Sequence, residues 1–249
     1  MIRTDLHMHT TYGDGRNTPE EMVLSALSIG MERIGFSEHS SVPFNPREGM
    51  TGDSVRKYIE EIRGLKEKYR GRIEILCGIE KDSASEQDVS EFDYVIGSVH
   101  YLGKDGAYFA VDDTPEVLRQ ALDRHYGGDF AALAEDYYDT VSRVAEKTGA
   151  HIIGHFDLIT KFSEKGMEID TDDPRYIAAW QRAADRLLPL GIPFEINTGA
   201  ISRGWRTSPY PERRILEYLR QRGGRFLLSS DSHSAGTIAY AFDRYESLL

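Results

Sequence analysis

The sequence contains a single cysteine, Cys77, so an intramolecular disulfide is impossible. A chain of 249 residues can bury enough apolar surface to fold without crosslinks, and lone thiols are typical of reducing compartments. The sequence also lacks an apolar run of about 18 residues, and its first residues do not resemble a signal peptide. We therefore expect a cytoplasmic protein that has no membrane partner.

Basic residues are scarce as well. Lys and Arg total 30 against 41 Asp and Glu, which gives a formal net charge of −11. Contact with a nucleic-acid backbone needs a basic surface, so we expect no nucleic-acid partner. A phosphorylated small molecule stays possible, because bound metal ions reverse the local charge. No linker, repeat or low-complexity segment interrupts the chain, so we predict one domain over residues 1–249. The oligomeric state is left open.

Seven short apolar segments have the composition of strands that are covered on both faces. They span residues 3–8, 33–38, 73–80, 94–101, 151–156, 193–198 and 225–231. Helical patterns separate them, at residues 18–30, 53–71, 114–122, 129–149, 172–191 and 211–224. The first helix has a capping box formed by Thr18 and Glu21, with Pro19 at its first position. This alternation predicts an α/β fold with a parallel sheet, and seven units favour a barrel over an open sheet.

Histidines concentrate at the C-terminal ends of these predicted strands, the face on which parallel barrels build active sites. Six of the eight lie there: His7, His9, His39, His100, His155 and His233. Glu80 ends a further strand, and Asp231 precedes His233 by two residues. His7 and His9 are separated by one residue, so their side chains share one face of a strand. Asp14 lies between two glycines, which allow its loop to bend over the barrel mouth.

These residue types predict a metal site. Glu80 can bridge two ions through its two oxygens, and mixed imidazole and carboxylate ligands suit zinc, manganese or iron. A lone histidine at a strand end is usually an ordinary polar residue, but six histidines with two acids at equivalent positions favour metal binding. Two histidines are excluded: His151 begins the strand that His155 ends, and His125 follows a helix, where a solvated role is the simpler interpretation.

Several motifs in this order resemble the polymerase and histidinol phosphatase (PHP) superfamily: "DLHMHTTYGDG", "FSEH", "GIEKD", "VIGSVH", "IIGHFDL" and "SSDSH". The segments "EINTGAISRG" and "SPYP" look like its histidinol-phosphate phosphatase branch. The resemblance implies a distorted (β/α)7 barrel, similar to a TIM barrel, with two or three divalent ions (Mn, Zn or Fe). It also implies that a small phosphomonoester, L-histidinol phosphate, is hydrolysed to L-histidinol and phosphate in histidine biosynthesis.

The resemblance further implies how the ligands divide among the ions. The first ion would be held by His7, His9, Glu80 and Asp231; the second by Glu80, His100 and His155; the third by Asp14, His39 and His233. Glu38 departs from the family pattern, in which aspartate often precedes this histidine. As the strand neighbour of His39 it should face away from the mouth, so we leave it out of the predicted site.

Such ions would lower the pKa of a bound water, and a bridging hydroxide would attack phosphorus. Asp231 or His233 could protonate the leaving oxygen. Arginine matches phosphate oxygens well, so we predict that Arg203 is a catalytic phosphate ligand, with Arg206 and Lys161 as further substrate-binding residues. The cationic part of histidinol would need an acidic or aromatic contact, for which Asp14, Tyr101 and Phe44 are candidates.

Three alternatives remain open at this point. A PHP-type nuclease would use the same ions, although the acidic charge disfavours it. An amidohydrolase barrel also begins with H-x-H but usually bridges its metals with a carboxylated lysine, whereas here the fourth strand ends in His100. A barrel that binds phosphorylated ligands without catalysis is the third, and the presence of every expected ligand disfavours it.

Overall fold

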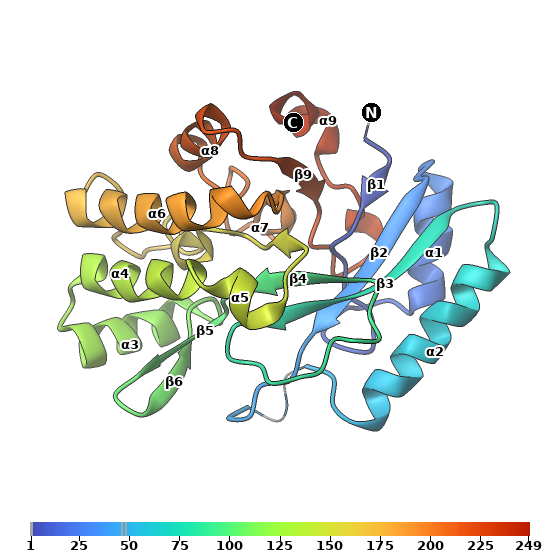
Figure 1. Ribbon diagram of the computed structural model, residues 1–249, viewed down its shortest axis with the longest axis horizontal. Coiled ribbons are helices and arrows are strands. Elements are labelled where there is room, and N and C mark those ends of the chain that lie inside the picture. The colour runs from blue at the N-terminus through green and yellow to red at the C-terminus, as the bar shows by residue number, and fades with distance from the viewer. Residues whose placement is uncertain (1, 46, 48) are drawn as a thin grey trace.

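The computed structural model describes residues 2–45, 47 and 49–249. Its centre is a sheet of seven parallel strands, which follow one another in space in the order of the chain (Figure 1). They are β1 (Thr4–Asp5), β2 (Arg33–His39), β3 (Glu74–Asp82), β4 (Tyr94–Ser98), β7 (Ile152–Ile153), β8 (Phe194–Asn197) and β9 (Phe226–Ser229). Each of the seven predicted strand segments overlaps one of these strands, although β2 and β3 run one and two residues further than predicted, so the predicted α/β class is confirmed.

The first and last strands meet just beyond their C-terminal ends. Met8 and Ser232 form a parallel bridge there. The His9 amide donates to the Ser232 carbonyl at 2.8 Å, and the Ser232 amide donates to the His7 carbonyl at 3.1 Å. These bonds bring the two ends of the sheet together, so the molecule is a distorted (β/α)7 barrel, as predicted.

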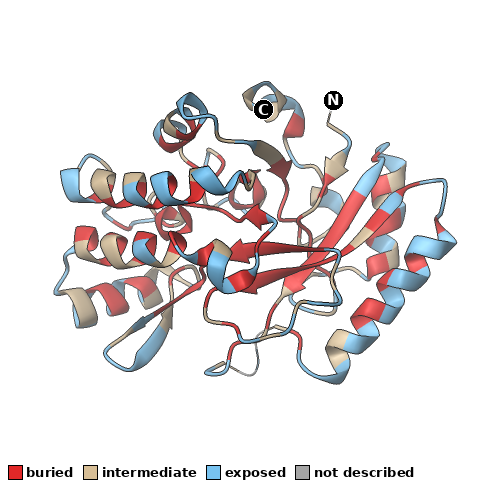
Figure 2. Cartoon of the chain, viewed as in Figure 1, coloured by how far each residue is buried: buried red, intermediate tan, exposed pale blue. Residues whose placement is uncertain are grey.

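Helices cover the outside of the sheet. They are α1 (Pro19–Ser28), α2 (Asp53–Lys68), α3 (Pro115–Tyr126), α4 (Phe130–Val141), α5 (Val144–Thr148), α6 (Pro174–Leu187), α7 (Gly199–Ser202), α8 (Arg213–Gln221) and α9 (Phe242–Tyr245), with short 3-10 turns η1 (Leu158–Thr160), η2 (Leu188–Leu190), η3 (Ala235–Thr237) and η4 (Glu246–Leu248). Figure 2 shows the buried strands inside and the exposed helix faces outside. Across the described ranges, none of these helices is both long and apolar enough to cross a membrane.

The helix starts follow the predicted capping chemistry, but one predicted helix is divided. The Thr18 side chain accepts from the Glu21 amide, and the Glu21 carboxylate accepts from the Thr18 amide, which completes the capping box of α1. The predicted helix over 129–149 is instead two helices, α4 and α5. Ser142 at the break donates through Oγ to the Asp139 carbonyl at 2.7 Å, a local bond that competes with continued helix.

The predicted strand over 94–101 also ends early, and a hairpin that the strand pattern did not predict follows it. β5 (Tyr101–Lys104) pairs antiparallel with β6 (Ala107–Ala110). Asp105 and Gly106 connect them, both with positive φ, and Asp-Gly is a typical sequence for such a turn. The hairpin returns the chain to the end of β4, where the Val111 amide donates to the His100 carbonyl at 2.8 Å.

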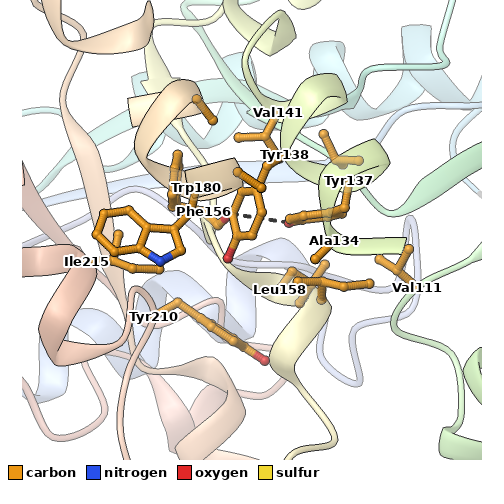
Figure 3. Packing of buried hydrophobic residues seen from close by; sticks show 14 of the residues in the cluster. Val111, Ala134, Tyr137, Tyr138, Val141, Phe156, Leu158, Trp180, Tyr210 and Ile215 are labelled. Atoms are coloured by element: carbon orange, nitrogen blue, oxygen red, sulfur yellow. Dashed lines mark hydrogen bonds between the residues drawn. The ribbon is translucent and has the colours of Figure 1, made fainter. Parts of the chain in front are cut away.

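Of the four apolar clusters among the described residues, the two largest hold most of the long helices against the sheet. The larger lies between α4, α6 and the strands, and Figure 3 shows Trp180, Tyr137, Tyr138 and Phe156 within it. The Tyr137 hydroxyl donates to the Phe156 carbonyl at 3.4 Å, so this buried polar group has a partner. The second cluster packs α1 and α2 against β2 and β3, with Phe36 fully buried. These clusters pack around the sheet, and the polar side chains of the candidate site lie instead at the C-terminal ends of the strands.

Stability should depend on the larger cluster. Leu133 in α4 is fully buried, whereas Leu24 in α1 is 50% exposed. Leu133→Ala should lower the free energy of unfolding by about 2–5 kcal/mol, because it removes buried methyl groups and leaves a cavity. Leu24→Ala, a matched control in another helix, should change it by less than about 0.5 kcal/mol. Denaturant unfolding followed by circular dichroism measures both; equal effects would contradict the assigned packing.

Candidate metal centre

Glu80 lies at the centre of the histidine cluster, near the C-terminal end of β3. Strand register sets His39 beside it, and His39 Nδ1 is 2.9 Å from Glu80 Oε2. His155 Nε2 lies 2.8 Å and His100 Nε2 3.3 Å from the other oxygen, Oε1. His7 and His9 approach Oε2 through Nε2, at 3.3 and 3.6 Å. Thus one buried carboxylate contacts, through both of its oxygens, imidazoles that lie at the end of β2 or just beyond the ends of β1, β4 and β7.

The remaining predicted ligands complete this cluster. Asp231 Oδ1 lies 3.5 Å from His9 Nε2 and 3.8 Å from His7 Nε2. Asp14 Oδ2 lies 3.1 Å from His233 Nε2, and Asp14 Oδ1 lies 3.9 Å from His39 Nε2. All nine predicted ligands are therefore linked by short contacts around one mouth of the barrel.

The loop that carries Asp14 bends back as its glycines suggested. The amides of Gly13 and Gly15 both donate to the Thr10 carbonyl at 3.0 Å. A Cβ on Gly15 would lie 2.5 Å from the His9 carbonyl, so only glycine allows this close approach. This loop brings Asp14 to the same side of the barrel as His39 and His233.

The donor atoms fit metal ions. Both ring nitrogens of His9, His7 Nε2 and Glu80 Oε2 are buried without a hydrogen-bond partner. Burial, with His233 and His39 nearby, lowers the pKa of His9 to about 3, so its imidazole is neutral and has a free lone pair. Three groups of these side chains have ligand atoms within 4.8 Å of one another: His9, Asp14, His39 and His233; His7, His9 and Glu80; and His39, Glu80 and His100. Such mixed nitrogen and oxygen donors suit divalent ions.

Nearby cationic side chains keep the two buried carboxylates of the cluster, Glu80 and Asp231, ionised. Burial by itself would raise the pKa of Glu80, but His7, His100 and His39 outweigh burial and hold that pKa well below its ordinary value. Likewise, burial opposes ionisation of Asp231, whereas Arg203 and His7 lower its pKa well below the usual range. Both carboxylates are therefore ionised and available to cations.

Glu195, on β8, is a residue that the sequence analysis missed. Its Oε1 accepts from His7 Nδ1 at 2.6 Å, and its Oε2 accepts from the His155 amide at 3.1 Å. Because a carboxylate only accepts, His7 carries a proton on Nδ1 and directs Nε2 toward Glu80 and Asp231. A carboxylate behind a histidine is a common support for a metal ligand. The available signal was an acidic residue in the middle of the predicted strand over residues 193–198.

Glu38, which was left out of the predicted site, is buried beneath the loop that carries Asp14. Its Oε1 accepts from the Thr10 amide at 2.7 Å and from the Thr10 hydroxyl at 2.6 Å. Its Oε2 has no hydrogen-bond partner and lies 4.0 Å from His9 Nδ1. Burial raises the pKa of Glu38 to about 8. Glu38 therefore lies behind His9, closer to the cluster than its strand position suggested.

A cavity of about 850 Å³ opens above the cluster, and two of the three predicted cations line it. Arg203 donates to Asp231 Oδ2 at 2.9 Å and to the Asp231 carbonyl at 2.8 Å, and its Nη1 lies 2.9 Å from His233 Nδ1. Lys161 lies 3.1 Å from Asp112 in the cavity wall. Arg203 thus holds two of the predicted ligands while it faces the cavity.

Arg206 is placed elsewhere. It is buried next to Asp157, donates to Thr160 Oγ1 at 2.7 Å, and stacks over the Tyr210 ring at 4.5 Å. Arg206 is not among the described residues that line the cavity. The reason is that the Asp157 carboxylate lies buried behind the mouth and attracts the guanidinium. We predicted Arg206 as a substrate-binding residue, but the structure does not bring it to the substrate side.

The two excluded histidines lie outside the cluster. His151 accepts from the Val95 amide at 3.2 Å, at the opposite end of β7 from His155. His125 lies 3.1 Å from Asp105 and stacks on Phe109. His151 agrees with the structural role inferred from its spacing, whereas His125, which we expected to be solvated, lies in the last turn of α3 with its side chain only 9% exposed.

The PHP domain family matches residues 5–199, which include most of the clustered ligands. The chain is a member of the PHP domain family. The match covers most of the barrel, so PHP membership accounts for the order of motifs from His7 to Glu195.

Comparisons with single proteins agree with this PHP assignment. A Deinococcus radiodurans protein named "probable histidinol-phosphatase" is 32% identical, over 96% of this chain and 89% of its own length. A Listeria monocytogenes structure assigned as a histidinol phosphatase has a TM-score of 0.84 at 20% identity and covers 97% of this chain and 99% of its own. The histidinol phosphate phosphatase of Lactococcus lactis, solved with zinc, L-histidinol and phosphate, has a TM-score of 0.73 at 22% identity, with 99% and 92% covered. The two structures show that the PHP fold is shared over nearly the whole chain.

Removal of divalent ions should destabilise this PHP protein, because buried carboxylates and imidazoles would lose their shared cations. We expect dialysis against a chelator to lower the thermal unfolding midpoint by about 5–15 °C, and zinc or manganese to restore it. Elemental analysis confirms depletion, and buffer with the same chelator already saturated by zinc is the control. An unchanged midpoint after confirmed depletion would contradict a metal role in holding the cluster.

Proposed function

We propose that this chain is a metal-dependent phosphomonoesterase that hydrolyses L-histidinol phosphate to L-histidinol and phosphate. The observation that carries the proposal is the cluster of nine imidazole and carboxylate side chains at the base of a cavity that Arg203 and Lys161 also line. The choice of substrate is supported by the names of the Deinococcus and Lactococcus proteins, which resemble this chain over nearly its full length.

The ligands would divide among the ions as the motifs suggest. Glu80, with one oxygen toward His7 and His9 and the other toward His100 and His155, would bridge two ions. Asp231 would complete the first site, and the remaining ligands, Asp14, His39 and His233, would hold a third ion. When bound, divalent ions lower the pKa of water and neutralise phosphoryl oxygens.

The chain's own residues would orient the ester. Arg203 offers a planar guanidinium at the cavity wall, the geometry that suits phosphoryl oxygens. It is fixed by Asp231 and lies against His233, so all three residues form one unit. In this unit, Arg203 would bind phosphate, and Asp231 or His233 would lie near the leaving oxygen. Lys161 would supply a second positive charge in the lining of the same cavity.

A substrate panel tests the proposal. Purified protein with manganese or zinc should release phosphate from L-histidinol phosphate with a kcat/KM at least about 100-fold higher than from sugar phosphates or p-nitrophenyl phosphate, because binding of the amino acid portion adds transition-state stabilisation. Single-stranded oligonucleotides should not be cleaved. Preferential cleavage of oligonucleotides would instead support a PHP nuclease, and no turnover with metal bound would support a binding protein.

Glu80→Gln should reduce both metal content and activity. The amide keeps the shape but loses the charge that balances the imidazoles, so we expect the loss of at least one bound ion and a fall in kcat on the order of 100-fold or more. The matched control is Glu74→Gln on the same strand, where the carboxylate is exposed and pairs with Arg33. Elemental analysis and phosphate release measure the two effects. Full activity of Glu80→Gln would contradict the proposed bridging role.

A further inference from the structure

An ion pair between Lys161 and Asp112 forms part of the cavity wall. Lys161 Nζ lies 3.1 Å from Asp112 Oδ2 and donates to the Asp112 carbonyl at 2.6 Å. The two side chains are only 12% and 23% exposed, and both line the cavity above the metal cluster. Among the described residues, most Lys and Arg ion pairs lie on the open surface, whereas this pair is largely shielded from solvent and faces the place where a substrate would bind.

The surroundings fix this pair next to the reaction site. Lys161 Nζ lies 5.6 Å from the Phe162 ring and 5.9 Å from the Trp205 ring, and both rings displace water from the ammonium. Asp112 follows the hairpin, and its neighbour Val111 is tied to the His100 carbonyl. The wall therefore presents one positive and one negative group, side by side, above His100 and His155.

L-Histidinol phosphate also carries one positive and one negative group close together. Its ammonium and its phosphoester are on adjacent carbon atoms, so the two charges are a few ångströms apart. We propose that the Lys161–Asp112 pair is the element that selects a 2-amino phosphate monoester: Asp112 binds the substrate ammonium and Lys161 binds a phosphoryl oxygen. This inference rests on the proposed function and names the residues that set its specificity.

The pair is selective because, when a substrate binds, the Lys161 ammonium and the Asp112 carboxylate must each keep a partner of opposite charge. A zwitterionic substrate exchanges one ion pair for two new ones. A phosphate ester without the ammonium draws Lys161 away and leaves the shielded Asp112 carboxylate with a poorer partner and a repelling phosphate beside it. An unmatched, partly buried charge is costly, so such a ligand is rejected.

The test compares two substrates in three proteins. The substrates are L-histidinol phosphate and its desamino analogue, 3-(imidazol-4-yl)propyl phosphate. Wild-type protein should prefer the amino substrate by at least about tenfold in kcat/KM. Asp112→Asn should reduce that preference on the order of tenfold, mainly through a higher KM for the amino substrate, and should change the analogue by less than about threefold. Asp113→Asn, at the exposed rim, should keep the wild-type preference.

The possible outcomes separate failure of the specificity inference from failure of the proposed function. Equal kcat/KM values for the two substrates in wild-type protein would overturn the inference even if Asp112→Asn did not fold. A uniform loss on both substrates in Asp112→Asn, with metal content and thermal midpoint intact, would also overturn it and assign Asp112 a structural role. If wild-type protein releases phosphate from neither substrate, the proposed function fails and the inference with it, whereas turnover of both without discrimination leaves the phosphatase proposal in place.

Discussion

The structure depends on one electrostatic constraint: the Glu80 carboxylate is buried among five imidazoles at the barrel mouth. A buried negative charge is tolerated only when positive partners surround it, and His7, His100 and His39 supply that charge. Glu195 behind His7 extends this requirement outward, whereas Glu38 behind His9 does not, because burial raises its pKa to about 8. The centre is thus a set of mutually dependent charges, which divalent cations would complete.

The barrel satisfies that constraint because its strands are parallel and in register. Parallel strands put all their C-terminal ends on one face, and His39 lies directly beside Glu80 in the pairing of β2 with β3. Closure matters equally, because the bonds between the segments after β1 and β9 bring His9 to Asp231. The apolar packing of the helices therefore holds the strands in the positions that bring the polar side chains together at the barrel mouth.

The proposed substrate contacts lie in parts of the chain outside the strands. Arg203 follows β8, Lys161 follows β7, and Asp112 follows the hairpin β5–β6. None of these three residues is a predicted metal ligand, so the metal cluster and the proposed substrate contacts are made by different side chains. Such a division between a catalytic centre and the loops around it is typical of barrel enzymes.

The sequence by itself determined the seven strands, the capping of α1 and the identity of the clustered side chains, because strand periodicity and strand-end position are local signals. It could not place side chains whose partners are distant in the chain. Glu195 and Glu38 acquire their roles from His7 and His9, and Arg206 is drawn to the buried Asp157 although Arg203, three residues earlier, faces the cavity. Those outcomes follow from burial and charge in three dimensions, which only the tertiary structure decides.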